Sequence, residues 1–357
     1  MSGLLFVAPT RIGDAVLSTG LLDRMLDRWP SAPVTIACGP PAAPLFAHVP
    51  RLERVIVMAK RPGGAHWLGL WRSVAGRRWD AVVDLRRSAL AWLLAARARL
   101  VRRGTPADDP RHRVVELAAG FSIEPPPAPR LWLDRSERDE AARRVPAGTP
   151  VLAIGPTANW RGKEWPADRF AALALRLVGP GGPLEGARVA VLAAAEERAR
   201  AAPVLDAIPI ERRIDLIGAP LLVAAACLER VALFVGNDTG AMHLAAAAGA
   251  PTLGLFGPSD ERHYAPWGSR AAHVRTAESL AALNGRDPRT TGSLMGGLSV
   301  EMAEAAARRL LAATGVAAPC PGRASSRRSP ARTTAAPRIS SSGSAARSIA
   351  RACRSGS

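Results

Sequence analysis

The stretch Val231–Phe256, VALFVGNDTGAMHLAAAAGAPTLGLF, decides the fold of this chain. It reads as a buried strand (Val231–Val235), a turn of small and polar residues, an alanine-rich helix (Ala241–Ala248) and a second strand (Thr252–Phe256). Two neighbouring strands joined by a helix run parallel, and a parallel sheet is covered by helices on both faces. The stretch therefore predicts an α/β protein.

The same alternation of strand and helix patterns runs along the rest of the chain. Strands are predicted at 4–8, 34–37, 54–58, 81–85, 151–154 and 188–193, and helices at 15–28, 89–100, 136–144, 167–178 and 221–229. The cycle restarts after a proline run at 125–127, with a hinge near 146–150. We expect two Rossmann-like domains with parallel sheets facing across a cleft, at residues 1–147 and 148–317, followed by a tail at 318–357.

Composition sets the class of protein. The chain has 357 residues, of which 48% are hydrophobic and 22% charged, enough for two domains with their own cores, so a disulfide-stapled or fully disordered protein is excluded. The four cysteines form no CxxC pair, and no cluster has metal-ligand spacing, so no metal site is expected. Neither a signal peptide nor a membrane-spanning segment is expected, and the chain reads as cytoplasmic.

The positive charge is concentrated in the tail. The formal net charge is +18, and residues 318–357 hold eight arginines and no acid, which leaves +10 on the first 317 residues. With few large apolar side chains, the tail is expected to be disordered. Its absence of aromatic residues argues against nucleic acid binding. A basic tether to anionic lipid, or an extension without function, remains open.

The loop after the first strand is Ala8–Asp14, APTRIGD. It lacks the GxGxxG pattern, which argues against a nicotinamide cofactor. Gly13 permits a tight turn. Asp14 has two interpretations, because it stands where a helix N-cap belongs and also where a carboxylate would face the cleft and accept a proton from a hydroxyl.

Two further loops open helices of the second domain. Lys163, in the loop Gly155–Pro166, is a three-donor cation suited to phosphate, or else a solvated loop lysine. The turn before the helix at 241–248 presents backbone N–H groups and the positive end of a helix dipole to an anion such as a diphosphate. There, Asp238 caps the helix or accepts hydrogen bonds from sugar hydroxyls, and His243 is a packed helical histidine or a ligand contact.

A family resemblance rests on these residues. The stretch Asn237–Gly268, NDTGAMHLAAAAGAPTLGLFGPSDERHYAPWG, resembles the signature of the ADP-heptose:lipopolysaccharide heptosyltransferases, glycosyltransferase family 9. The Gly13-Asp14 loop, the segment Lys163–Pro166 and the helix start Leu298–Glu301 match the family in the same order. The resemblance spans roughly residues 3–313.

The resemblance implies a GT-B fold whose first domain binds the acceptor and whose second domain binds a nucleotide sugar. In family terms Asp14 matches the catalytic base and Lys163 a phosphate contact. Glu197 best aligns with the acidic nucleoside contact, although Ala193–Ala195 replace the glycines of the family there. The remaining matches are the donor-binding residues Asp238, Thr239, Gly240 and His243, and the acceptor-side residues Thr10, Arg11 and Gly13.

The implied reaction is an inverting transfer of heptose from ADP-heptose to a sugar hydroxyl of the lipopolysaccharide inner core. The nucleotide sugar is then the only co-substrate, without cofactor or metal, because no DxD-like pair accompanies these sites. Contact with the anionic cytoplasmic face of the inner membrane is implied as well. Basic residues that either face acidic sugars and lipid or form solvated helix faces are Arg86, Arg87, Arg97, Arg99, Arg102 and Arg103.

Other function classes remain open on the residues alone. A nucleotide-sugar epimerase of the same fold would isomerise the free donor and need no lipid acceptor. A non-catalytic protein that binds sugar nucleotides or lipopolysaccharide would have no need for a base at Asp14. A nucleic-acid binder would depend on the tail.

Deleting residues 318–357 is predicted to leave folding and sugar transfer to a soluble acceptor nearly unchanged, because this segment has no core-forming residues. Thermal unfolding of the full chain and the truncated chain measures this. A large drop in the melting temperature on truncation would show that the tail packs on the protein.

Overall fold

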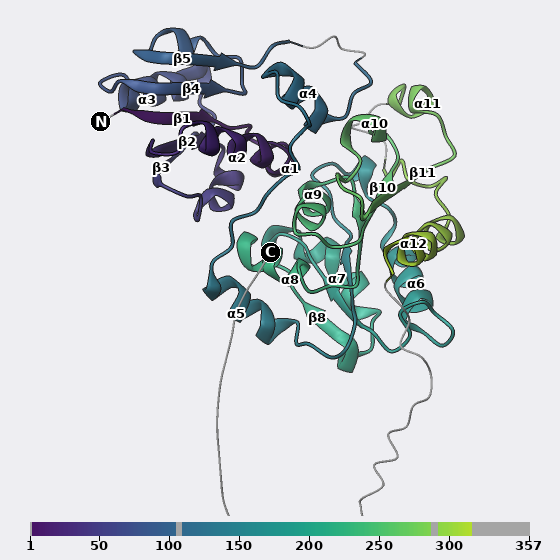
Figure 1. The fold of residues 1–357 in the computed structure, drawn as a ribbon. Helices are drawn as coiled ribbons and strands as arrows, with labels where there is room; N and C mark the ends of the chain where they lie inside the picture. The colour runs from purple at the N-terminus through teal and green to yellow at the C-terminus, as the bar shows by residue number, and fades with distance from the viewer. Residues whose placement is uncertain (1, 105–108, 287–291, 316–357) are drawn as a thin grey trace, which may run out of the picture. The chain divides into compact units, whose positions relative to one another are not determined.

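Two parallel β-sheets, one from each half of the chain, carry the fold (Figure 1). The computed structural model describes residues 2–104, 109–286 and 292–315. The strands of the first sheet are β1 (Gly3–Val7), β2 (Val34–Cys38), β3 (Leu52–Val57), β4 (Trp79–Asp84) and β5 (Ala96–Val101). Those of the second are β6 (Val151–Gly155), β7 (Arg188–Val191), β8 (Arg213–Asp215), β9 (Leu233–Asn237), β10 (Thr252–Phe256) and β11 (Ala271–Arg275).

Helices cover both sheets. They are α1 (Ile12–Leu17), α2 (Thr19–Arg28), α3 (Ala65–Val74), α4 (Arg113–Gly120), α5 (Arg135–Arg144), α6 (Ala167–Val178), α7 (Arg198–Asp206), α8 (Leu221–Leu228), α9 (Gly240–Ala247), α10 (Glu261–Tyr264), α11 (Leu280–Asn284) and α12 (Val300–Thr314). Within the described ranges, no helix is both long and apolar enough to cross a membrane.

The strand order places a ligand crevice in each sheet. The orders are β3-β2-β1-β4-β5 and β11-β10-β9-β6-β7-β8, with every pairing parallel. The chain direction along the sheet reverses beside β1 in the first sheet and between β6 and β9 in the second. In open α/β sheets, ligands bind at the carboxyl ends of the strands at this reversal. The loops after β1, β6 and β9 are therefore the expected binding loops.

Central strands are apolar because helices bury both of their faces. Every residue of β1, β2, β6, β9 and β10 is buried. The edge strands β3 and β5 carry charged residues and are partly exposed, which discourages pairing with another chain.

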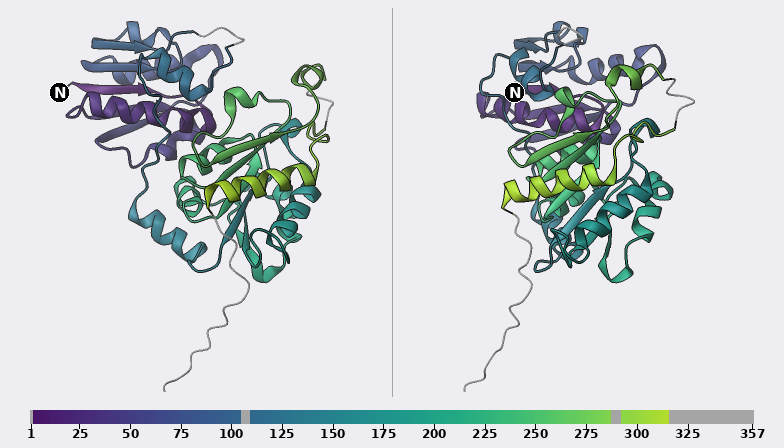
Figure 2. Two further views of the ribbon diagram at one scale, coloured as in Figure 1. Left: turned by 45° about the vertical axis from the view of Figure 1, so that its right-hand side comes forward. Right: turned by 90° about the vertical axis from the view of Figure 1, so that its right-hand side faces the viewer.

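One apolar cluster links the two sheets. It runs from Leu4 and Phe6 in β1, through Trp132 and Ala141 in the connecting segment, to the residues of α8 and β9 in the second sheet. Helix α5 packs directly against α8, and α12, yellow-green in Figure 2, packs against α6. Both sheets accordingly lie within one compact unit.

The α/β prediction is confirmed, with two local corrections. The predicted helix 89–100 is wrong, because only Ala89–Trp92 form a short 3₁₀ turn and Ala96–Val101 form β5. The alternation of Ala and Arg there suits an edge strand whose alternate residues reach solvent. The predicted helix 15–28 is two helices, interrupted at Ser18, whose hydroxyl donates to the Ala15 carbonyl. The boundary at residues 147 and 148 stays a prediction, and the tail 318–357 lies outside the described residues.

Candidate active site

A cavity of about 620 Å³ lies at the carboxyl ends of the strands of both sheets. Loops after β1, β6, β7 and β9 contribute to its walls. It is lined by all ten residues that the sequence matches to the family's catalytic, donor-binding and acceptor-side positions, namely Thr10, Arg11, Gly13, Asp14, Lys163, Glu197, Asp238, Thr239, Gly240 and His243. The structure thus brings residues from both halves of the chain to one site.

Two glycines let α1 and α9 meet in the wall of this cavity. A Cβ atom on Gly240 would lie 2.9 Å from Cγ2 of Ile12 and 3.3 Å from the backbone nitrogen of Gly13. A Cβ atom on Gly13 would lie 2.9 Å from Cδ2 of His243. Side chains at either position would push the helices apart, so the glycines set how closely the two halves of the site approach.

Asp14 is not a helix cap, contrary to one of its two interpretations. It is the third residue of α1, the N-cap position belongs to Arg11, and no side-chain capping bond is formed. Its Oδ1 atom is buried and makes no hydrogen bond with any described residue. The nearest cation is Arg113, whose Nε lies 3.6 Å from that oxygen. A carboxylate held near a cation but without a donor bond can accept a proton from a ligand.

Arg113 is held from behind by a buried carboxylate. Its Nη1 donates to Glu116, one turn further along α4, at 2.7 Å. Glu116 is 1% exposed, also pairs with Arg102, and lies 3.5 Å from His263 Nε2. Because Glu116 fixes one end of the guanidinium, Arg113 is directed at Asp14. Arg102 is therefore a structural partner and not a solvated residue.

Lys163 belongs to the loop between β6 and α6. Its Nζ donates to Oδ2 of Asp238 at 2.6 Å, so the interpretation as a solvated lysine is wrong. Buried Asn237 holds this loop in place, since its Oδ1 accepts from the Trp165 amide at 3.0 Å and its Nδ2 donates to the Pro156 carbonyl at 2.8 Å. The strand end that carries Asp238 thereby also positions the loop that carries Lys163.

Asp238 does not cap α9. The N-cap is Thr239, in an extended conformation and without a side-chain capping bond. The first described bond into the helix is from the His243 amide to the Thr239 carbonyl, so the earlier amides of the turn are not used within the helix. An anion in the cavity can accept hydrogen bonds from these amides, at the positive end of the helix dipole.

His243 is a packed histidine that also borders the cavity. It is 4% exposed, and its Nε2 lies 3.9 Å from Oδ1 of Asp238. Burial lowers the pKa of His243 to about 4, outweighing the opposite influence of Asp238. The ring is neutral at neutral pH and adds no positive charge to the site.

Glu197 lies at the far end of the cavity, after β7. Its carboxylate accepts from the Thr157 hydroxyl at 2.7 Å, from the Ala194 amide at 3.2 Å and from Arg200 at 2.8 Å. Arg200 also pairs with Glu164, next to Lys163. Ala193–Ala195 line the cavity where glycines were expected, so the small side chains still leave room.

Several residues in or next to the cavity were not singled out in the sequence. Tyr264, the only tyrosine of the chain, ends α10, and burial raises its pKa, with the Asp14 carboxylate adding to the effect. It lies within the stretch Asn237–Gly268, so that match could have pointed to it. Arg113 and Glu116 could have been found as an i,i+3 pair, but only once a helix at 113–120 had been predicted.

One group among the described residues has the geometry to hold a metal ion. It consists of His48, Asp134 and Glu137, none of which lines the cavity. These groups already bond to one another, with His48 Nε2 2.8 Å from Glu137 and the Asp134 amide donating to Glu137 at 2.8 Å.

Comparisons with known proteins agree on one family. The family model described as "Glycosyltransferase family 9 (heptosyltransferase)" matches residues 75–288, more than half of the chain. The chain is 24% identical over 314 residues to lipooligosaccharide heptosyltransferase 2 of Haemophilus influenzae, covering 77% of this chain and 89% of that protein.

Solved structures share the fold. The heptosyltransferase II of Escherichia coli superposes with a TM-score of 0.69 at 20% identity, covering 88% of this chain and 99% of that one. A family 9 glycosyltransferase from Veillonella parvula gives 0.72 at 19% identity, covering 87% and 97%. The expected GT-B fold is confirmed.

Gly240→Ala is predicted to cost roughly 1–3 kcal/mol of unfolding free energy, because the added methyl group meets Ile12 and the Gly13 backbone. Gly69→Ala is the matched control, since no heavy atom lies within 4 Å of its Cβ position in α3, and it should stabilise by up to about 1 kcal/mol. Urea unfolding measures both. Equal stability of the two variants would contradict the close contact.

Stability is predicted to fall as the pH drops from 6.5 towards 4. Over this range the unfolded chain protonates His243 while the folded chain, with its pKa near 4, does not, which favours unfolding by up to about 1.4 kcal/mol per pH unit. His243→Gln removes this contribution. Urea unfolding at pH 7 and pH 4.5 should show a smaller loss for the variant, and an identical loss would mean that the histidine is not buried in its neutral form.

Proposed function

Because the chain belongs to glycosyltransferase family 9, the heptosyltransferases, and is a glycosyltransferase, we propose that it moves heptose from ADP-heptose to a sugar hydroxyl of the lipopolysaccharide inner core. The names of its relatives support the sugar and the acceptor, since they are lipopolysaccharide and lipooligosaccharide heptosyltransferases. Family membership also removes the epimerase and the non-catalytic binding protein as alternatives.

One observation carries the mechanism: Asp14 and the Lys163–Asp238 pair line the same cavity from opposite halves of the chain. An inverting transfer needs a base on the acceptor side and a cation on the leaving-group side. The first half of the chain supplies the carboxylate and the second half supplies the ammonium.

In the proposed reaction, Oδ1 of Asp14 takes the proton of the acceptor hydroxyl. The hydroxyl oxygen attacks the anomeric carbon from the face opposite the diphosphate, and the bond between that carbon and the phosphate oxygen breaks. The electron pair leaves with the nucleoside diphosphate, so the anomeric configuration is inverted. Arg113, whose Nε lies 3.6 Å from Oδ1, orients the carboxylate before the proton moves.

Lys163 stabilises the departing diphosphate. An ammonium has three donors, and Asp238 accepts one of them, which leaves two for phosphate oxygens. The pairing also offsets the negative charge that Asp238 would otherwise present to the diphosphate. The backbone amides of Thr239 and Gly240 add hydrogen bonds to the diphosphate. Because the fold already orients these amides, they do not have to rearrange during the reaction as water molecules would.

The remaining residues bind the two substrates. Asp238 keeps its second carboxylate oxygen for hydroxyls of the donor sugar, with neutral His243 beside it. Glu197 contacts the nucleoside, held in position by Thr157 and Arg200. On the acceptor side the loop residues Thr10, Arg11 and Gly13 border the attacking hydroxyl.

No metal ion takes part in this proposal. Lys163 and the helix amides supply the positive charge that a divalent cation supplies to a departing diphosphate in other enzymes. We further propose that the protein acts in the cytoplasm, at the inner-membrane face where a lipid-linked acceptor is exposed.

Asp14→Asn is predicted to lower kcat by on the order of 10²- to 10⁴-fold, because asparagine cannot accept the proton at neutral pH. The affinity for the nucleotide sugar should barely change, since the second half of the chain binds it. Transfer to a core-truncated acceptor under saturating donor measures kcat, and titration calorimetry measures donor binding.

Asp23→Asn is the matched control, because Asp23, in α2, pairs with Arg130 and lies outside the cavity. It should keep the wild-type rate. Lys163→Ala should weaken donor binding and slow transfer together, because the phosphate charge is present in both the ground state and the transition state. If Asp14→Asn retained more than about a tenth of the wild-type kcat, outside the range for a lost base, the mechanism would be wrong.

A further inference from the structure

Large apolar side chains are exposed on one side of the first sheet. Trp92 is 67% exposed, Leu93 65%, Leu68 48% and Trp71 37%. These four residues, here called the α3 face, lie on α3 and at the end of the 3₁₀ turn Ala89–Trp92, where Leu93 is the next residue. Large apolar side chains that gather on one exposed side of a protein mark an interaction surface.

The two segments of the α3 face pack on one shared core. Leu70 and Val74 of α3 belong to the same buried cluster as Leu90 and Leu94 of the turn, packed on the same face of the first sheet. The exposed residues therefore stand on the outer side of two segments whose inner sides share a core. This layer is rigidly supported and does not need to unfold to present its apolar side chains.

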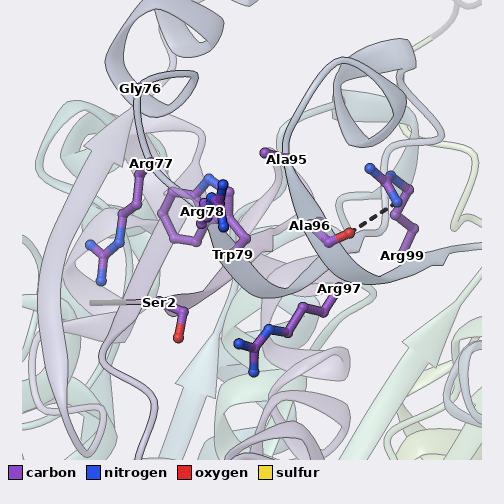
Figure 3. A pocket seen from close by; sticks show the side chains of 9 residues that line it. All are labelled: Ser2, Gly76, Arg77, Arg78, Trp79, Ala95, Ala96, Arg97 and Arg99. Carbon is purple, nitrogen blue, oxygen red and sulfur yellow. Dashed lines mark hydrogen bonds between the residues drawn. The ribbon is translucent and has the colours of Figure 1, made fainter.

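A second cavity, of about 690 Å³, lies just beyond the ends of these two segments (Figure 3). It lies between Gly76, just after α3, and Ala95, just before β5, and the Trp79 amide donates to the Ala95 carbonyl at 2.8 Å across its floor. Both positions lie where β4 and β5 begin. The active-site cavity lies at the opposite end of the sheet, where the strands finish. Four arginines line it, Arg77, Arg78, Arg97 and Arg99, and no acidic residue does.

The arginines divide into fixed and available groups. Arg99 donates to the carbonyls of Ala91, Leu94 and Ala96 and so fixes the turn. Arg78 is exposed and makes no hydrogen bond or ion pair within the described part of the chain. Arg97 is 84% exposed and lies 3.7 Å from Asp80.

Figure 3 shows Arg77 and Arg97 on either side of Ser2. Arg77 pairs with Glu53 and stacks on the Trp79 ring at 4.9 Å. Arg78 and Arg97 are therefore the two guanidinium groups of this cavity that can reach an anion such as phosphate.

We propose that the α3 face and this arginine cavity together dock the protein on an anionic lipid bilayer. Trp92 and Leu93 enter the boundary between headgroups and acyl chains, where tryptophan is favoured, and Arg78 and Arg97 bind lipid phosphates. Charge complementarity selects this occupant, because apolar side chains beside the exposed Arg78 and Arg97 match a surface that is apolar inside and negative outside.

The far end of the α3 face supports the same orientation. Arg86, which follows β4, stacks over the Trp67 ring at 4.5 Å. Arginines therefore lie near both ends of the strands, with Arg78 and Arg97 at the amino ends and Arg86 at the carboxyl end of β4. A bilayer along this layer leaves the active-site cavity uncovered, at the carboxyl ends of the strands. The inference deepens the proposed function and rests on it for its biological purpose, but binding itself requires no sugar transfer.

The test is co-sedimentation of the full-length protein with vesicles of phosphatidylcholine, alone or mixed with phosphatidylglycerol. The double variants Trp92→Ser/Leu93→Ser and Arg78→Glu/Arg97→Glu should each bind the anionic vesicles at least about tenfold more weakly than wild type. Wild type should prefer anionic vesicles, and added salt should weaken its binding.

Two matched controls lie away from the surface. Ile210→Ser removes an apolar side chain that is 80% exposed, and Arg135→Glu reverses a charge that is 91% exposed. Both should bind vesicles like wild type. Every variant keeps the tail at residues 318–357, so any vesicle binding by its arginines is the same in all the proteins compared. Single variants Leu93→Ser and Arg97→Glu serve where a double variant unfolds, as judged by its melting temperature.

Three results would overturn the inference. The surface variants could bind like the controls, wild type could bind neutral vesicles equally well, or RNA could compete fully with the vesicles for binding. Measuring sugar transfer to a soluble acceptor distinguishes failure of the docking inference from failure of the proposed function. The surface variants should keep the wild-type transfer rate on that acceptor, whereas a failed functional proposal would leave wild type itself inactive.

Discussion

The contact between α1 and α9 is the constraint on which the rest of the site depends. Gly13 and Gly240 face each other there, and neither position has space for a Cβ atom without displacing Ile12, His243 or backbone. Because both helices begin directly after a central strand, their close approach brings the loop of Asp14 to the turn of Asp238. The candidate active site is thus built where a helix from each half of the chain meets the other, and the lack of side chains at Gly13 and Gly240 sets how closely they approach.

Charge is distributed across this contact in a way that fits the proposed chemistry. On one side Arg113, anchored by buried Glu116, faces a carboxylate oxygen that has no hydrogen bond. On the other side Lys163 is already paired with Asp238. The proposed base is left open to a ligand while the cation is held in position, and His243 stays neutral because burial lowers its pKa. Substrates therefore meet groups whose positions are set before they arrive.

Sequence patterns predicted the residues of this site better than the elements around it. Strand, turn and helix at Val231–Phe256 follow from periodicity and the NDTG turn, and all ten named residues line one cavity. Arg113 escaped notice because its partner Asp14 is distant in the chain and no helix was predicted around it. The segment 96–101 was misread because alanine and arginine favour helices, whereas pairing with β4 makes it an edge strand. The roles of Asp14 and Lys163 needed geometry, since only contacts distinguish a cap from an open carboxylate or a solvated lysine from a paired one.

The central claim is that this cavity transfers a sugar with inversion from a nucleotide sugar to a lipid-linked core sugar. Incubating the full-length protein with ADP-heptose and a core-truncated lipopolysaccharide tests it most directly, with the product read by mass spectrometry and its anomeric linkage by NMR. The account predicts an acceptor heavier by one heptose, joined with the anomeric configuration opposite to that of the donor. A retained configuration, or an unchanged acceptor beside an isomerised donor, would contradict it.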